Sequence, residues 1–109
     1  MSRFSDILER LTATIASRKG GDPTTSWTAK LLANPGLIGA KVLEEAAETV
    51  EAAGEDDPDH LCAESADLIY HWLVLLAARG VSLDDVAAKL ESREGMSGIA
   101  EKAARPKPD

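Results

Sequence analysis

Apolar residues recur every three or four positions along most of the chain, which is the spacing of one face of an α-helix. Breaks in this pattern coincide with glycine and proline, which end helices and form loops. Ser82 and Asp85 have the spacing of a capping box at the start of the last helix. The expected helices cover about residues 3–17, a short segment that begins after Thr25 or Ser26, and residues 37–53, 59–79 and 82–93. There is no internal repeat and no strand pattern, so the sequence predicts an all-α fold with a four-helix-bundle-like core.

The segment from Leu68 to Ala78 is apolar around almost the whole helix. Such a helix must be covered on more than one side, and its short neighbours within one chain offer little cover. We therefore expect a homodimer whose interface includes this helix. A central helix inside a compact monomer is the alternative.

Composition supports one helical domain. The chain has 109 residues, of which 44% are hydrophobic and only 4% aromatic, and this mixture favours packed helices over a sheet. We expect the domain to cover residues 1–95. Glycine, lysine and proline interrupt the rest of the chain, so residues 96–109 are expected to form a flexible tail.

Charge and targeting patterns exclude several classes of partner. The net charge of −7 argues against binding to a nucleic-acid backbone or an anionic membrane, because the field repels both. The single Cys62 excludes a disulfide framework and a cysteine-rich zinc site. The N-terminus lacks a signal-peptide pattern, and the apolar run from Leu73 to Ala78 is too short to span a bilayer. We expect a cytoplasmic protein.

Carboxylates gather in the third and fourth expected helices without basic partners. From Val42 to Ala78 there are ten carboxylates and no lysine or arginine. Glu64 and Asp67 lie one turn apart on the fourth helix. At about 100° per residue, one face of the third helix carries three glutamates, namely Glu44, Glu45 and Glu48.

Two interpretations of these carboxylates are possible, a solvated face and a metal site. The acidic face of the third helix lies opposite the apolar stripe of Leu43, Ala46 and Val50, and Glu64 and Asp67 lie beside a stripe expected to be buried. Surface helices usually pair such charges with lysine or arginine, and carboxylates near buried surface are costly. A divalent cation removes both penalties. Antiparallel helices that face ExxE against ExxD can form a carboxylate cage, so the pattern favours a metal.

Every candidate ligand atom is a carboxylate oxygen, and such a site favours Mg²⁺ or Mn²⁺ over zinc or iron. Helical di-iron sites use a Glu-x-x-His motif, and neither His60 nor His71 has that spacing. His71 lies in the most apolar turn and is expected to be a hydrogen-bonded core histidine.

A carboxylate-held metal suggests phosphoanhydride chemistry, for which the chain must also supply cations to the phosphates. The candidates are Arg18, Lys19, Lys30 and Lys41. Lys41 is the strongest, because it lies on the same side of its helix as Glu45 and Glu48. A salt bridge to Glu45 is the alternative for Lys41. For Arg18 and Lys19 the alternative is that their charges complement the C-terminal end of a helix dipole.

The run Lys41 to Glu48, followed by Glu64-Ser-Ala-Asp67, resembles the ExxE…ExxD signature of the all-α nucleoside triphosphate pyrophosphohydrolases, the MazG-like superfamily. Within that superfamily, the stretches Asp22 to Leu32, Lys41 to Glu48 and Ala66 to Val86 are similar to the phosphoribosyl-ATP pyrophosphatase family. The likeness extends over nearly the whole chain up to about Arg93.

This resemblance implies a magnesium-dependent homodimer that hydrolyses phosphoribosyl-ATP to phosphoribosyl-AMP and pyrophosphate, the second step of histidine biosynthesis. It implies that Lys30 and Lys41 contact phosphates. Glu44 is implied as a further ligand or as a group that orients the water. The motif leaves open which glutamates bind the metal and which acts as base, so the catalytic candidates are Glu44, Glu45 and Glu48. The implied metal ligands are Glu45, Glu48, Glu64 and Asp67.

One residue departs from the family pattern: Trp27 stands where tyrosine is expected, which keeps an aromatic ring and removes a hydroxyl. Two other functions remain possible on the sequence. A house-cleaning MazG-like hydrolase would share the metal site and prefer free nucleoside triphosphates. A non-enzymatic dimeric interaction module would carry a merely solvated acidic face.

Overall fold

The computed structural model describes residues 2–95 and 98–105. These ranges contain helices and no strand, which confirms the all-α expectation. The helices are α1 (Arg3–Ser17), α2 (Trp27–Leu32), α3 (Pro35–Ala53), α4 (Pro58–Ala78), α5 (Leu83–Ser92) and α6 (Gly98–Ala104). All five expected helices are present, and α6 is an addition to them.

The helix ends follow from local capping. Ser26 begins α2 by accepting a hydrogen bond from the Ala29 backbone N–H, so Ser26 rather than Thr25 is the cap. The capping box of Ser82 and Asp85 at the start of α5 is confirmed, because each side chain accepts a hydrogen bond from the other residue's backbone N–H. Gly80 ends α4 with a φ of 67°, a left-handed conformation that favours glycine.

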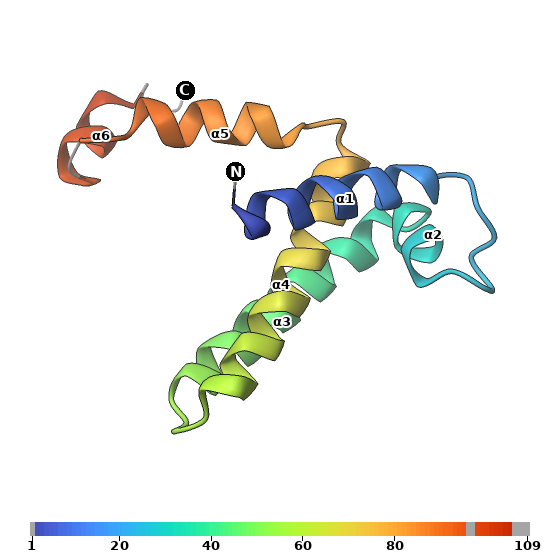
Figure 1. Ribbon diagram of the computed structural model, residues 1–109. Coiled ribbons are helices and arrows are strands. Elements are labelled where there is room, and N and C mark those ends of the chain that lie inside the picture. The colour runs from blue at the N-terminus through green and yellow to red at the C-terminus, as the bar shows by residue number, and fades with distance from the viewer. Residues whose placement is uncertain (1, 96–97, 106–109) are drawn as a thin grey trace.

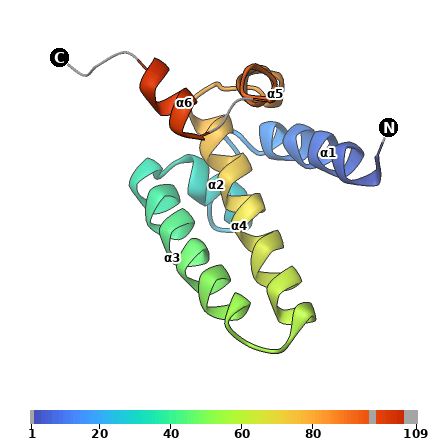
Figure 2. The ribbon, with the colours of Figure 1, turned by 90° about the vertical axis from the view of Figure 1, so that its left-hand side faces the viewer.

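Helices α3 and α4 form a long antiparallel hairpin, and Figures 1 and 2 show it extending away from the other helices. Helix α1 packs against α4, while α2 packs against both α3 and α4. The core lies where these four helices meet, and its buried residues are Ile15, Leu31, Ile38, Leu73 and Val74. The part of the hairpin nearest its connecting loop is therefore covered by neither α1 nor α2.

The apolar face of α3 is largely exposed, and part of its acidic face is buried, although apolar faces of helices are usually the buried ones. Leu43 and Val50, from the expected apolar stripe, are each 74% exposed, whereas Glu45 on the acidic side is 6% exposed. On α4, the stripe expected to be buried is only half-buried: Leu61, Leu68, Trp72 and Leu75. Part of the acidic face of α3 thus turns toward α4, while Glu44 and the apolar side chains of Leu43 and Val50 stay exposed.

Helix α5 projects from the bundle, as Figure 1 shows. None of its residues is buried, and Leu90 is 64% exposed. Between α5, α1 and α4 there is an open apolar groove of about 240 Å³, lined by Leu8, Trp72, Leu83, Val86 and Leu90 among others.

Among the described helices, α4 alone is long and apolar enough to cross a membrane, judged by length and composition. The core helix of a soluble protein satisfies the same test, and one such helix is weak support for a span. Helix α4 also carries Glu64 and Asp67 near its middle, where an ionised carboxylate facing lipid is costly.

The proposed division at residue 95 stays a prediction. Of the expected tail, the structure describes residues 98–105, which contain α6. Residues 96–97 and 106–109 lie outside the described residues.

Candidate metal centre

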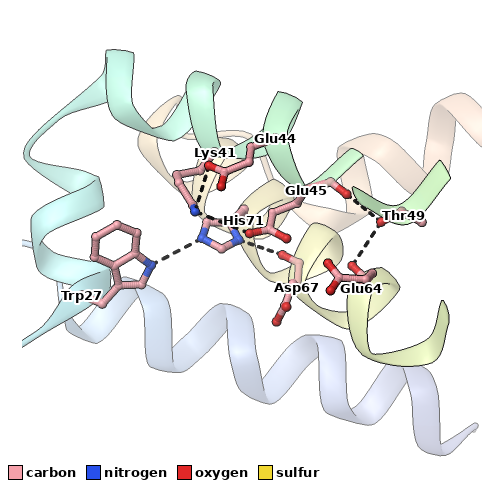
Figure 3. A network of polar contacts seen from close by, with 8 residues as sticks. All are labelled: Trp27, Lys41, Glu44, Glu45, Thr49, Glu64, Asp67 and His71. Carbon is pink, nitrogen blue, oxygen red and sulfur yellow. Dashed lines mark hydrogen bonds and ion pairs between the residues drawn. The ribbon is translucent and has the colours of Figure 1, made fainter. Parts of the chain in front are cut away.

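Three carboxylates converge between α3 and α4. Glu45 and Glu48 come from α3, and Glu64 comes from α4. One oxygen from each of the three lies within 4.8 Å of the others. Figure 3 shows the Glu45 and Glu64 side chains between the two helices. The antiparallel hairpin produces this meeting, because i, i+3 spacing aligns two glutamates on α3 and the short loop brings α4 beside them.

The cluster leaves two carboxylate oxygens without partners. Glu45 is 6% exposed, and Oε2 of Glu45 and Oε2 of Glu64 are both buried with no hydrogen-bond donor. An unsatisfied buried carboxylate oxygen is strongly destabilising. A divalent cation between these residues would satisfy both oxygens, and the all-oxygen donor set suits Mg²⁺. The residues present therefore fit the metal that the sequence pattern favours.

Without a cation, the pKa values of Glu45 and Glu48 both lie above their usual range. Burial is the main cause that raises the pKa of Glu45 above its usual value, and the nearby Glu48 adds to it. The pKa of Glu48 is raised chiefly by its hydrogen bond to the Glu64 side chain. A cation reverses these effects because it favours the ionised form of every ligand.

Thr49 joins the two helices at the cluster. Its hydroxyl lies 2.7 Å from the carbonyl oxygen of Glu45 and 3.2 Å from the carbonyl oxygen of Glu64. The hydroxyl proton is thus shared between one acceptor on α3 and one on α4 (Figure 3). This contact fixes the spacing between two residues of the cluster. Sequence spacing gave no signal for it, because the contact to Glu64 depends on how the helices pack.

Lys41 lies at the edge of the cluster, on the side of Glu44. Its Nζ is 3.1 Å from Oε2 of Glu44 and 3.5 Å from Oε1 of Glu45, so the salt bridge considered from the sequence is present. The hydrogen bond to Glu44 is the main cause that raises the pKa of Lys41. The Lys41 ammonium is therefore held beside the carboxylates. A phosphate that entered here would meet a positive charge.

Asp67 lies one turn after Glu64 and is exposed. Its carboxylate is not one of the three that converge, and in Figure 3 it points away from Glu45 and Glu64. Its negative charge nonetheless contributes to the raised pKa of Glu45. The Asp67 carbonyl oxygen accepts a hydrogen bond from Nδ1 of His71, 2.8 Å away. His71 is 6% exposed, which confirms that it is a hydrogen-bonded core histidine.

The other predicted cations lie on different elements. Arg18 caps the C-terminus of α1 and is exposed. Lys30 is on α2, with its Nζ 5.7 Å from the centre of the Trp27 ring. The structure therefore brings Lys41 to the cluster and leaves Arg18 and Lys30 without a contact to it.

His60 is a neighbour of the cluster to which the sequence assigned no role. Its Nε2 lies 3.3 Å from Oε1 of Glu64, and its Nδ1 lies 2.7 Å from Oε1 of Glu55. The hydrogen bond to Glu55 is the main cause that raises the pKa of His60. The i, i+4 spacing from His60 to Glu64 is the one signal of this contact in the sequence, and it differs from the Glu-x-x-His spacing of helical di-iron sites.

Known proteins resemble this chain over nearly its full length. It is 65% identical over 106 residues to the phosphoribosyl-ATP pyrophosphatase of Caulobacter sp. (strain K31), an alignment that covers 97% of this chain and 99% of that protein. It is 58% identical over 102 residues to the phosphoribosyl-ATP pyrophosphatase of Ruegeria pomeroyi, covering 93% and 97%. Residues 8–94 also match the family described as phosphoribosyl-ATP pyrophosphohydrolase, and with this match the chain belongs to that family.

Proposed function

We propose that this chain hydrolyses phosphoribosyl-ATP to phosphoribosyl-AMP and pyrophosphate, the second step of histidine biosynthesis. Relatives named for this reaction align with almost the whole chain at up to 65% identity. The observation that carries the proposal is the group of converging carboxylates, which includes two buried oxygens without donors. Such a group suits a cation bound together with phosphates.

Glu45, Glu48 and Glu64 would hold Mg²⁺, with Asp67 as a further ligand from the next turn of α4. Mn²⁺ would suit the same oxygens. When bound, the metal neutralises phosphate oxygens and lowers the pKa of a water molecule. Three carboxylates from two rigid helices define its place without help from a loop.

Other residues of the chain would bind the phosphates and prepare the water. Lys41 is already oriented by Glu44 and Glu45, so substrate phosphates would enter next to a fixed ammonium group. Lys30 and Arg18 would supply further positive charge. Glu44 lies outside the converging group, and its side chain is 53% exposed. It is thus available to orient the attacking water or accept its proton.

The active form would be a homodimer. Leu43 and Val50 expose apolar surface on α3, and most of α4 is only partly covered within one chain. A second copy would remove this surface from water. The substrate is a soluble nucleotide, so a cytoplasmic location suits the reaction. The net charge of −7 disfavours nucleic acid and anionic membranes as partners.

The direct test is pyrophosphate release from phosphoribosyl-ATP with Mg²⁺ and with EDTA, beside a panel of ordinary nucleoside triphosphates. We expect metal-dependent turnover of phosphoribosyl-ATP and little turnover of the panel. Preference for the free triphosphates would move the protein to the house-cleaning hydrolases. Absence of any turnover would overturn the enzymatic proposal.

A further inference from the structure

Two hydrogen bonds made by the His71 side chain connect the backbone of α4, the helix that carries Glu64, to Trp27 on α2. Nδ1 of His71 lies 2.8 Å from the Asp67 carbonyl oxygen, which can only accept, so Nδ1 carries the hydrogen. Nε2 of His71 is then the acceptor for the indole N–H of Trp27, with a nitrogen–nitrogen distance of 3.4 Å. Figure 3 shows the imidazole between Asp67 and Trp27. Nδ1 therefore holds the imidazole against α4, and Nε2 orients the indole of Trp27.

A second contact holds α2 at the same place. The hydroxyls of Thr28 and Tyr70 are hydrogen-bonded, next in sequence to the pair of Trp27 and His71. The rings of Tyr70 and His71 meet edge to face with their centres 5.0 Å apart. The six-residue helix α2 is too short to be stable alone, so these contacts and its buried Leu31 set its position.

The face of the Trp27 ring carries a charge. Lys30 follows Trp27 by three residues on α2, and its Nζ lies 5.7 Å from the centre of the indole. In the part of the chain that the structure describes, Lys30 makes no salt bridge, whereas Lys41 is paired with Glu44 and Glu45. An aromatic face restricts an ammonium group without neutralising it. Lys30 is thus oriented and keeps its charge for an anion.

We infer that Trp27 is a positioning residue for Lys30 in the binding of substrate phosphates. His71 fixes the indole edge relative to α4, and the indole face fixes the ammonium of Lys30 relative to the indole. This inference rests on the proposed function, because it takes the phosphate chain of a nucleotide as the anion. Trp27 itself touches no reacting atom in this role.

The kinetic test is a double-mutant cycle between Trp27→Leu and Lys30→Met, with phosphoribosyl-ATP as substrate. We expect Trp27→Leu to raise KM about two- to fivefold, the range of a cation–π contact at an exposed site, with kcat nearly unchanged. The double variant should have the KM of Lys30→Met alone. Trp27→Tyr, which keeps a ring and a donor, should restore most of the affinity.

Trp72→Phe is the matched control for loss of an indole. Trp72 lines the groove between α1, α4 and α5 and belongs to neither the carboxylate cluster nor the Trp27 network, so its KM should equal that of the wild type. Multiplicative effects of Trp27→Leu and Lys30→Met on KM would overturn the inference. Failure of the wild type to turn over phosphoribosyl-ATP would instead refute the proposed function.

A measurement without turnover decides the geometry separately. In NMR spectra, the ε-methylene protons of Lys30 should be shifted upfield by the indole ring current in the wild type and in Trp72→Phe. The shift should disappear in Trp27→Leu. Calorimetry should measure the Kd of inorganic pyrophosphate in the presence of Mg²⁺ for the same variants. The double variant should have the Kd of Lys30→Met alone. An unshifted Lys30 in the wild type, or additive losses of pyrophosphate affinity, would overturn the inference.

Discussion

At the residue scale, Glu48 is central to the cluster, because it interacts with Glu45 on its own helix and with Glu64 on α4. Asp67 adds charge from the next turn. We expect Glu48→Gln and Asp67→Asn each to abolish Mg²⁺-dependent turnover, since an amide is a poorer ligand for Mg²⁺ than a carboxylate. The helical circular dichroism spectrum should be unchanged, because the loss of like-charge repulsion does not weaken the helices.

Glu51→Gln is the control for this pair of variants, since Glu51 is exposed on the same helix one turn further on. Its turnover should match the wild type. Full activity in both Glu48→Gln and Asp67→Asn would remove the metal-site assignment altogether.

Burial of Glu45 makes stability depend on pH in the absence of metal. Its pKa is raised in the folded state, chiefly by burial. Above that raised pKa the group is ionised in both states, and the folded state bears the full penalty. As the pH falls toward the unfolded value of 4.5, the folded state takes up its proton first and the penalty is relieved.

We therefore expect Glu45→Gln to be more stable than the wild type in EDTA at pH 7.5, by about 1 kcal/mol in the free energy of unfolding. The difference should shrink as the pH falls toward 4.5. Urea denaturation at several pH values measures it, and Mg²⁺ should reduce it by stabilising only the wild type. A difference that grows with acidity would contradict the assigned cause.

At the scale of the elements, the site depends on how α3 meets α4, and Thr49 is the side chain that links their backbones there. Thr49→Val keeps the shape and removes the hydroxyl. We expect it to weaken Mn²⁺ binding about tenfold, at the lower end of the effect of residues that orient metal ligands. Thr49→Ser should restore binding. Calorimetric titration with Mn²⁺ measures both, and wild-type affinity in Thr49→Val would show that the hydroxyl does not set the spacing.

What the sequence could predict ends at the contact between helices. The sequence predicts that Glu45 and Glu48 share one face, because helical spacing is fixed within a single element. It also predicts that Glu64 lies opposite them, because a short loop makes adjacent helices antiparallel neighbours. The periodicity could not show that Leu43 and Val50 face outward, since it identifies residues that share a face and not the face that a neighbour covers.

Contacts between residues distant in sequence could not be predicted for the same reason. The hydrogen bond from Trp27 to His71 joins residues 44 positions apart, and the contact from Thr49 to Glu64 joins residues 15 apart. Each depends on the rotation of one helix about its axis relative to another, which packing determines. The capping box of Ser82 and Asp85 was predictable because all of its atoms lie within one turn.

At the scale of the whole molecule, the outward apolar surface and the inward acidic face have a common explanation. A lone hairpin would bury its apolar stripe and expose its charges. Here Glu45, Glu48 and Glu64 converge between α3 and α4, at the place proposed for the metal, and Leu43 and Val50 remain 74% exposed. Exposed apolar surface that is continuous along a helix is typical of a surface covered by a partner. A second copy of the chain would cover it if the protein is the proposed homodimer.

We expect light scattering at micromolar concentration to give twice the 11.5 kDa mass of the chain. The double variant Leu43→Asp, Val50→Asp should be monomeric, because each subunit would place two carboxylates in a desolvated interface. Ala13→Asp, a charge added to an exposed position on α1, should leave the mass unchanged. A dimeric double variant would place the interface elsewhere, and the open groove beside α5 would be the next apolar surface to test. A monomeric wild type would contradict the homodimer itself, and α4 would then act as the half-covered central helix of a single chain.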